Sequence, residues 1–396
     1  NSENPVVEVA KKLKIELCEI NPEKDGPSGI FNIYEKESEY SLPDESDEAL
    51  VLHTSGTTSR PKIVPLTNKN IFSSAENISK SLNLSENDHC LNIMPLFHIH
   101  GLIAILASSM KAGASVCASN GFNAIKFLDI AKSEKITWYS GVPTMHQTIL
   151  LRAHKNLEIA KGLELRLIRS SSASLPPAVF NDLNDVFSCP VIEAYGMTEA
   201  THQMTSNPLP PKQQKAGFVG LPAGPEVCIM NENGEVLKQG DEGEVCIKGE
   251  NVTLGYDNNE EANKTSFTNG WFRTGDQGYF DNEGYLKISG RLKEIINKGG
   301  EKISPLEVDN VLMDHPLIDQ AVCFGYEDKM LGENIASAII IKSGEACSEN
   351  DVLEYAQEKL AKFKIPKKIF FVEEIPKGAT GKLQRNVLAK KFGLNN

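Results

Sequence analysis

The sequence predicts an α/β protein in which a large domain of helix-flanked sheets is followed by a small, mobile α+β domain. Three changes of pattern along the 396 residues support this. Short β-like runs alternate with helical stretches up to about residue 220, which is typical of a mainly parallel sheet. Hairpin patterns follow to about residue 290, and a mixed pattern completes the chain. We therefore expect a large domain over residues 1–290, with a β-rich part over about 220–290, and a small domain over 291–396.

Apolar periodicity and turn residues define the expected elements in order. Residues 49–52, "ALVL", predict a buried strand, and residues 69–80 predict a helix. The next strands are expected at 136–142, 165–172 and 190–196, and the next helices at 123–135, 144–161 and 176–187. Asn-Gly and Glu-Gly turns predict hairpins at 226–237 and 278–290, with further strand at 243–256. The small domain should contain a strand pair, a helix at 305–313, a strand at 336–342, a helix at 349–360 and a strand at 366–377.

The overall composition excludes several classes of protein. A net charge of −12 argues against a general binder of nucleic acid or of membrane surfaces. No apolar run approaches the roughly 20 residues that span a bilayer, and the first residues, "NSENPVVEVAKKLKIELCEI", lack the pattern of a signal peptide. The eight cysteines include no C-x-x-C pair, which argues against a disulfide framework and a zinc site. Because "KKFGLNN" is not a peroxisomal Ser-Lys-Leu ending, we expect a cytoplasmic protein, monomeric or homodimeric.

Residues 53–67, "HTSGTTSRPKIVPLT", form a hydroxyl-rich loop between the first strand and helix. Small residues leave backbone N–H groups exposed, and a nest of such groups beside Lys62 suits a phosphate. An ordinary polar loop is the alternative. The segment contains no G-x-x-x-x-G-K-[ST], so a P-loop NTPase is excluded, and no G-x-G-x-x-G of a Rossmann dehydrogenase follows the first strand.

Four further segments are too polar or too rich in glycine to be explained by folding alone. In "EAYGMTEATH" (193–202), Thr198 and Glu199 would suit Mg²⁺ shared with a nucleotide, whereas the alternative is a helix start capped by Thr198. In "GWFRTGDQGYF" (270–280), Asp276 would accept bonds from a ribose diol or from its own turn. "GRLKEIINKGGEKISP" (290–305) suits a hinge or a solvated linker, and "PKGATGKLQR" (376–385) carries Lys382 on a loop that is either mobile and functional or merely exposed.

The five segments in this order resemble the adenylate-forming superfamily, which includes acyl-CoA synthetases, firefly luciferase and peptide-synthetase adenylation domains. The resemblance covers residues 48–390 and rests on "TSGTTSRPK", "YGMTE", "GWFRTGD", "GRLKEIINKGGEKISP" and "PKGATGKLQR". It implies an ATP-dependent acid–CoA ligase that adenylates a carboxylic acid, releases pyrophosphate and transfers the acyl group to CoA, with Mg²⁺ as cofactor. A non-catalytic nucleotide-binding relative and an enzyme that loads a carrier protein are the alternatives.

The resemblance assigns roles position by position. The ATP phosphates would be bound by Thr54, Ser55, Gly56, Thr57, Thr58 and Lys62. The adenine slot would be lined by Ser172, Ala173, Ser174, Glu193, Ala194 and Tyr195, and the ribose held by Asp276 and Arg291. Thr198 would touch the α-phosphate, Glu199 would hold Mg²⁺, and Lys382 would bind the carboxylate and the α-phosphate during adenylation. The small domain would then rotate about Lys293, so that Lys298, Gly299 and Gly300 line the pantetheine tunnel.

Four segments are more closely similar to the oxalate–CoA ligase branch, which lies near the 4-coumarate–CoA ligases: "MPLFHIHGL", "WYSGVPTMHQ", "RSSSASL" and "EAYGMTEATHQMTSNPLP". A pocket for an aryl or fatty chain is mostly apolar. Here the expected acyl wall offers polar side chains instead: His98, His100, Ser170, Ser171, Ser172, Thr201 and His202.

Oxalate is a small dianion whose second carboxylate needs a donor or a positive partner. His202 is the first candidate, followed by His98 and Ser172. His98 as an aromatic gate and His202 as a polar residue on the outer side of its loop are the alternatives, with a 4-coumarate-like or medium-chain ligase as the alternative function. Only 52 residues precede His53, so the resemblance also leads us to expect that the first part of the large domain is missing, and an inactive fragment with exposed apolar surface is a further alternative.

Overall fold

The computed structural model of the chain describes residues 5–17, 20–22, 31–33, 42–54, 62–119, 121–378 and 383–394. The chain divides into two compact units, Asn1–Asp44 and Glu45–Asn396. The first unit contains helix α1 (Pro5–Leu13) and the antiparallel strands β1 (Ile20–Pro22) and β2 (Phe31–Ile33). All elements described below belong to the second unit.

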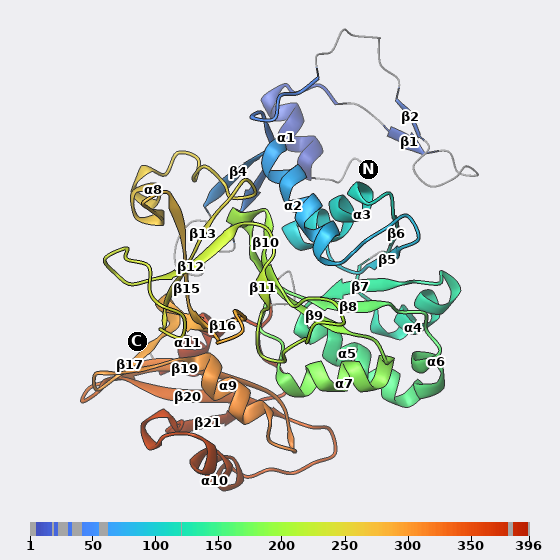
Figure 1. The fold of residues 1–396 in the computed structure, drawn as a ribbon. Helices are drawn as coiled ribbons and strands as arrows, with labels where there is room; N and C mark the ends of the chain where they lie inside the picture. Colours follow the sequence, from blue (N-terminus) through green and yellow to red (C-terminus); the bar gives the residue numbers. More distant parts are fainter. Residues whose placement is uncertain are drawn as a thin grey trace. The chain divides into compact units, whose positions relative to one another are not determined.

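A seven-stranded sheet forms the centre of the large domain, in the order β11-β10-β9-β8-β7-β5-β6 (Figure 1). Its strands are β5 (His89–Asn92), β6 (Ser115–Ala118), β7 (Trp138–Gly141), β8 (Leu167–Ser170), β9 (Val191–Met197), β10 (His202–Ser206) and β11 (Leu221–Pro222). Strands β5 to β9 pair in parallel, and β10 and β11 add antiparallel strands at one edge. The mainly parallel sheet predicted from the sequence is confirmed.

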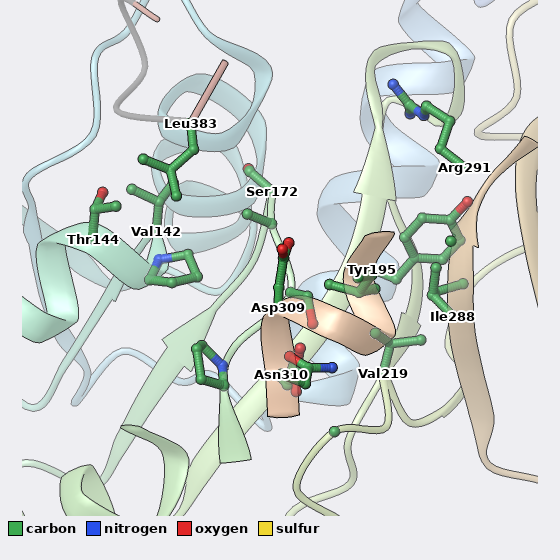
Figure 2. Close-up of a pocket in the computed structure, with 18 of the residues that line it drawn as sticks. Val142, Thr144, Ser172, Tyr195, Val219, Ile288, Arg291, Asp309, Asn310 and Leu383 are labelled. Atoms are coloured by element: carbon green, nitrogen blue, oxygen red, sulfur yellow. The ribbon is translucent and has the colours of Figure 1, made fainter. Parts of the chain in front are cut away.

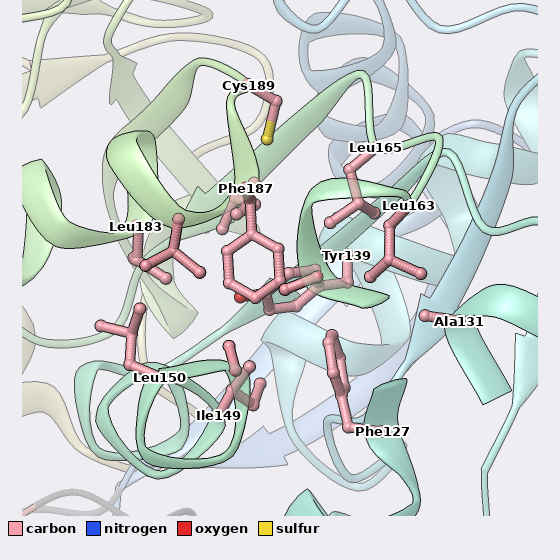
Figure 3. Close-up of a cluster of buried hydrophobic side chains, with 14 of the residues drawn as sticks. Phe127, Ala131, Tyr139, Ile149, Leu150, Leu163, Leu165, Leu183, Phe187 and Cys189 are labelled. Carbon is pink, nitrogen blue, oxygen red and sulfur yellow. The ribbon is translucent and has the colours of Figure 1, made fainter. Parts of the chain in front are cut away.

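Helices cover both faces of this sheet because its parallel strands are apolar on both sides. Trp138 and Tyr139 are neighbours in β7, yet they belong to different hydrophobic clusters, one on each face. The cluster that contains Tyr139 packs against α4 (Ala124–Ser133), α5 (Pro143–Ala153), α6 (Leu157–Lys161) and α7 (Pro177–Phe187), as Figure 3 shows in part. The cluster that contains Trp138 packs against α2 (Asn68–Ser81) and the π-helix η1 (His100–Ala107), which leads into α3 (Ser108–Lys111).

Two helix predictions have different outcomes. The helix expected at 69–80 is confirmed as α2, whose first turn is held by a capping box between Thr67 and Asn70. The helix expected at 144–161 is interrupted instead, because α5 and α6 are separated by the 3₁₀ turn η2 (His154–Asn156). The Asn156 side-chain amide donates to the Arg152 carbonyl oxygen over 2.9 Å, a local bond that competes with the helical backbone pattern.

The strand predicted at 49–52 forms, but it is not buried. Strand β3 (Glu48–His53) pairs only with β4 (Ile63–Thr67) in a two-stranded antiparallel sheet among the described residues. Val51 is 50% exposed, whereas Val64 and Leu66 of β4 are fully buried. The apolar run in β3 therefore reflects one partly covered strand and not a central one.

The β-rich part consists of β12 (Glu226–Met230), β13 (Gly243–Lys248), β14 (Phe267–Thr268), β15 (Trp271–Phe280) and β16 (Leu286–Arg291), with α8 (Glu260–Ser266) beside them. The hairpin predicted at 278–290 is confirmed, because β15 and β16 pair across the turn that contains Gly284. The other predicted hairpin is reduced to a tight turn with a single bridge between Met230 and Val236, and β12 pairs with β13 instead.

The C-terminal part, orange to red in Figure 1, has a five-stranded sheet with helices. Its elements are β17 (Ile296–Lys298), β18 (Glu301–Ile303), α9 (Pro305–Met313), β19 (Ile318–Asp328), β20 (Gly332–Ile341), α10 (Glu349–Lys359), β21 (Lys368–Phe371) and α11 (Leu388–Lys391). The expected strand pair, both helices and both later strands are present, whereas β19 was not predicted. Among the described residues, no helix is both long and apolar enough to span a bilayer, and the cysteines are free.

Candidate functional site

A cavity of about 270 Å³ opens where the large sheet, the β-rich part and the C-terminal part meet (Figure 2). Its walls include many of the residues singled out in the sequence: Ser172, Ala173, Ser174, Glu193, Ala194, Tyr195, Asp276 and Arg291. Most of these residues lie in β9 or directly after the carboxyl end of β8. Ligands commonly bind at the carboxyl ends of the strands in parallel sheets. The structure thus brings the expected adenine and ribose positions together around one cavity.

Three side chains on one wall of the cavity form a hydrogen-bonded set. The Tyr195 hydroxyl donates to Asp276 Oδ2 over 2.6 Å, and Arg291 Nε donates to Asp276 Oδ1 over 2.8 Å. Asp276 and Arg291 are paired residues of β15 and β16, so the sheet register sets their distance. The expectation that Asp276 sits in a turn is wrong, because it lies within a strand. The Asp276 carboxylate holds the pKa of the Arg291 guanidinium above its ordinary value, so this group is charged at neutral pH.

Glu193 lies on another wall and is almost completely buried, with 1% of its surface exposed. Its Oε1 accepts a hydrogen bond from the Leu175 backbone N–H over 2.9 Å. Burial raises the pKa of Glu193 to about 8, although the backbone N–H groups of Leu175 and Gly217 oppose this shift. A carboxyl group in this position is therefore largely protonated at neutral pH.

A second set of polar residues involves both ends of the hydroxyl-rich loop. The Thr54 N–H donates to the Lys62 carbonyl oxygen over 2.9 Å and closes the loop at its base. Lys62 Nζ lies 4.1 Å from the centre of the Tyr256 ring, and the Tyr256 hydroxyl donates to Glu199 Oε1 over 2.7 Å. Burial lowers the pKa of Lys62, as does Lys293, while Glu199 opposes this shift. Residues far apart in the sequence thus share one electrostatic environment.

Some predicted positions can be placed only in part. Thr198 is half-buried as the first residue of the 3₁₀ turn η3 (Thr198–Ala200); Met197 occupies the N-cap position without a side-chain capping bond, so Thr198 is not the cap that the alternative interpretation required. The predicted residues that lie outside the described part of the chain are Ser55, Gly56, Thr57, Thr58 and Lys382. Leu383, the residue after Lys382, lines the cavity and is labelled in Figure 2.

The expected acid wall contains a connected cluster of polar side chains. His100 Nδ1 lies 3.0 Å from the Ser172 hydroxyl, and His100 Nε2 lies 2.6 Å from the Ser140 hydroxyl. The His100 and His202 rings are 5.0 Å apart between their centres. His202 is 1% exposed, so the alternative that placed it on the outer side of its loop is wrong. Burial lowers the pKa of His100 and of His202 well below the ordinary value, and both rings are neutral at pH 7.

Three other polar residues of this wall make structural contacts, whereas the Ser170 hydroxyl is buried without a hydrogen-bond partner among the described residues. The His98 ring is half-buried, and its Nδ1 accepts from the His100 backbone N–H over 3.2 Å. Ser171 donates to the Ala194 carbonyl oxygen and Thr201 to the Asn251 carbonyl oxygen, each over 2.8 Å. These two hydroxyls hold neighbouring segments together and do not face the cavity.

Arg169 is the residue of this region that the sequence did not identify as functional. It lies in β8 directly before the serine run and is completely buried. Its guanidinium lies 3.1 Å from Gln203 Oε1, 3.4 Å from His202 Nδ1 and 3.5 Å from the Ser140 hydroxyl. The sequence signal that could have identified it is an arginine among the apolar residues of the strand predicted at 165–172.

The turn proposed for the pantetheine tunnel lies elsewhere. Gly299 and Gly300 form the turn between β17 and β18, with φ angles of +62° and +96°. These angles favour glycine for a local reason that does not require a ligand. Lys298 Nζ donates to the Phe363 carbonyl oxygen over 3.0 Å, and none of the three residues belongs to the cavity wall as described.

Comparison with known proteins identifies the family that carries this arrangement. The profile of the family described as "AMP-binding enzyme" matches residues 3–257, and that described as "AMP-binding enzyme C-terminal domain" matches residues 307–382. The chain belongs to the AMP-binding enzymes. The matched ranges include Glu199 and Lys382, and the expected α/β fold with its C-terminal domain is confirmed.

Similar AMP-binding enzymes are known in sequence and in structure. An oxalate–CoA ligase of Arabidopsis thaliana is 48% identical over 98% of this chain and 77% of its own length. An oxalate–CoA ligase of Saccharomyces cerevisiae is 49% identical over 88% of this chain and 64% of its own length. The structure of O-succinylbenzoate coenzyme A synthetase from Bacillus subtilis with ATP and magnesium ion has a TM-score of 0.78 and is 33% identical, covering 89% of this chain and 73% of its own length. These relatives place the chain among the AMP-forming acid–thiol ligases.

Proposed function

We propose that the chain is an oxalate–CoA ligase, which converts oxalate, ATP and CoA to oxalyl-CoA, AMP and pyrophosphate. The choice of oxalate rests on the buried polar cluster of His100, Ser172 and His202. A ligase for an aryl or fatty acid would need a mostly apolar surface in these segments. The two oxalate–CoA ligases described above, at 48% and 49% identity, support the same choice.

The nucleotide would occupy the cavity beside Tyr195. The Tyr195 ring offers a face on which adenine stacks, and Ser172, Ala173 and Ser174 lie across the cavity as small residues that leave room for the base. Asp276 would accept hydrogen bonds from the ribose hydroxyls, with Arg291 holding its carboxylate in position. Glu193 and Ala194 would complete the adenine slot.

The triphosphate would extend from there toward the hydroxyl-rich loop, Thr54 to Thr58, and Lys62. Lys62 would neutralise charge on the leaving pyrophosphate, and Thr198 would donate its hydroxyl to the α-phosphate. Lys382 would hold the acid carboxylate against the α-phosphate, which offsets the repulsion between two anions. The proximity of Leu383 to the cavity supports this role, because Lys382 precedes it directly.

Glu199 fits a Mg²⁺ ion that is bound together with phosphates. The described residues contain no cluster of three or more potential protein ligands, and a single carboxylate with phosphate oxygens is a usual environment for Mg²⁺. Glu199 Oε1 accepts from Tyr256, which orients the carboxylate, and this is how outer partners support metal ligands. When bound, Mg²⁺ would neutralise the charge that develops on the phosphates.

After adenylation, the small domain would rotate about Lys293 at a boundary that we place between residues 290 and 291. Lys293 lies in the 3₁₀ turn η4 (Leu292–Glu294), which directly follows β16, and it is exposed. Rotation would bring the turn of Lys298, Gly299 and Gly300 toward the acyl-adenylate, so that the CoA thiol reaches it. A glycine turn leaves the narrow path that a pantetheine arm needs.

The experiment that tests this function is CoA-dependent AMP formation from ATP and Mg²⁺ with oxalate, malonate, acetate, 4-coumarate and octanoate. We expect oxalate to be preferred, and His202→Ala to lower kcat/KM for oxalate by about 10-fold or more, since a buried hydrogen bond to a charged group is lost. His154→Ala is the matched control, because His154 is exposed and bonds to Asp182 on the surface. Preference for 4-coumarate or octanoate would overturn the choice of acid and leave the ligase class unchanged.

A further inference from the structure

We infer that Arg169 is the positioning residue that makes this site select an acid with a second negative charge. The inference rests on the proposed function, and it assigns the selectivity to a residue behind the pocket wall. Arg169 is linked to Ser172 through the side chains of Ser140 and His100, and it contacts His202 directly.

The first support is an uncompensated buried charge. Arg169 is 0% exposed, and the oxygen and nitrogen atoms near its guanidinium belong to the neutral groups Ser140, His202 and Gln203. No carboxylate among the described residues forms an ion pair with it, whereas Arg166, which directly precedes β8, pairs with Asp88. A buried charge without a counter-ion is costly, and an anion bound nearby offsets this cost.

The second support is the direction of the hydrogen bonds that lead from Arg169 to the cavity. A guanidinium only donates, so the Ser140 oxygen accepts from Arg169 at 3.5 Å. Among the described residues the Ser140 hydroxyl has no acceptor other than His100 Nε2 at 2.6 Å, so we assign Ser140 as the donor of that bond. The neutral His100 ring therefore carries its proton on Nδ1 and donates it to the Ser172 oxygen at 3.0 Å. The Ser172 hydroxyl hydrogen is then left to donate into the cavity, which Ser172 lines.

The second route leads through His202. Its Nδ1 faces Arg169 at 3.4 Å and must accept, so the neutral ring carries its proton on Nε2. Nε2 is buried without a hydrogen-bond partner among the described residues. A buried donor without a partner is rare in folded proteins and indicates a missing acceptor. Arg169 thus orients the Ser172 hydroxyl, which lines the cavity, and the Nε2 donor of His202, which lies buried behind the cavity wall.

The test compares two acids of the same shape, oxalate and oxamate, in which an amide replaces one carboxylate. We expect Arg169→Met to lower the ratio of kcat/KM for oxalate to that for oxamate by about 10- to 100-fold, the range for a lost charge-assisted hydrogen bond, with KM for ATP unchanged. Arg169→Lys should restore most of the ratio, because it keeps the charge. Arg166→Met is the matched control: it removes an arginine and destabilises the fold without changing the ratio.

The outcomes separate this inference from the proposed function. An unchanged oxalate-to-oxamate ratio in Arg169→Met would overturn the role of Arg169 while leaving an oxalate ligase intact. If the native chain uses malonate and not oxalate, the proposed acid fails, and the ratio of malonate to malonamate then decides the role of Arg169. Preference for monoanions would overturn both. If Arg169→Met does not fold, Gln203→Glu supplies an internal counter-ion 3.1 Å from Arg169, and the ratio should fall in the same way.

Discussion

The Tyr256 hydroxyl donates a hydrogen bond of 2.7 Å to Glu199 Oε1, while the ring of the same tyrosine lies 4.1 Å from Lys62 Nζ. One side chain thus connects the carboxylate proposed to hold Mg²⁺ with the lysine proposed to bind the phosphates. Tyr256 and Glu199 are each 6% exposed, so water cannot easily replace either contact.

Tyr256→Phe keeps the ring under Lys62 and removes only the bond to Glu199. We expect the Mg²⁺ concentration for half-maximal activity to rise about 10-fold, because outer partners of a metal ligand have effects of this size. The free energy of unfolding should fall by about 1–3 kcal/mol, the cost of an unsatisfied buried acceptor. Mg²⁺ titration and urea unfolding measure the two effects. Tyr326→Phe, a buried tyrosine of β19, is the control that should leave the Mg²⁺ dependence unchanged.

Asp276→Asn should weaken ATP binding without weakening acid binding. Asp276 receives hydrogen bonds from Tyr195 and Arg291 and would accept the ribose hydroxyls, and an amide offers only one acceptor oxygen. We expect KM for ATP to rise about 10-fold or more, while KM for oxalate changes little. Asp281→Asn, at the turn of the same hairpin, provides the comparison because Asp281 faces Lys215. Equal effects on both substrates would contradict the ribose assignment.

Lys382→Ala should abolish the first half-reaction selectively. Loss of a preorganised charge at the reacting centre costs about 10²- to 10³-fold in rate, so oxalate-dependent exchange of pyrophosphate into ATP should fall by this factor. Binding of ATP, measured by calorimetry, should change much less. Lys377→Ala replaces a neighbouring lysine whose backbone bridges to that of Leu383, and it should leave the exchange rate near normal.

The free energy of unfolding should depend on pH through Glu193. Burial raises the pKa of Glu193 to about 8, from an ordinary value of 4.5, so the folded chain retains a proton that the unfolded chain releases between these values. Folding therefore becomes less favourable as the pH rises from about 4.5 to 8. Glu193→Gln keeps the Oε1 acceptor and removes this dependence. Its free energy of unfolding should exceed that of the native chain by about 4 kcal/mol at pH 8, and the difference should nearly vanish at pH 4.5.

The helix predicted at 305–313 coincides with α9, Pro305–Met313, because proline in the first turn and the apolar spacing are both local signals. Strand β19 was missed for the opposite reason. Its central residues, Ala321 to Phe324, are all buried, so the strand shows no alternation of polar and apolar side chains. Such a run is recognised only once the layers on both sides are known.

The nucleotide-binding motifs, the α/β class and the polar character of the acid wall follow from the sequence by itself, because each depends on residue types at short spacing. Only the tertiary structure decided which polar groups of that wall act together. Arg169, Ser140 and His202 come from three different strands, and their distances depend on sheet order and register, which sequence spacing does not contain. Burial then determines charge states, because the exclusion of water keeps His100 and His202 neutral, while the buried Arg169 has no counter-ion in the described part of the chain.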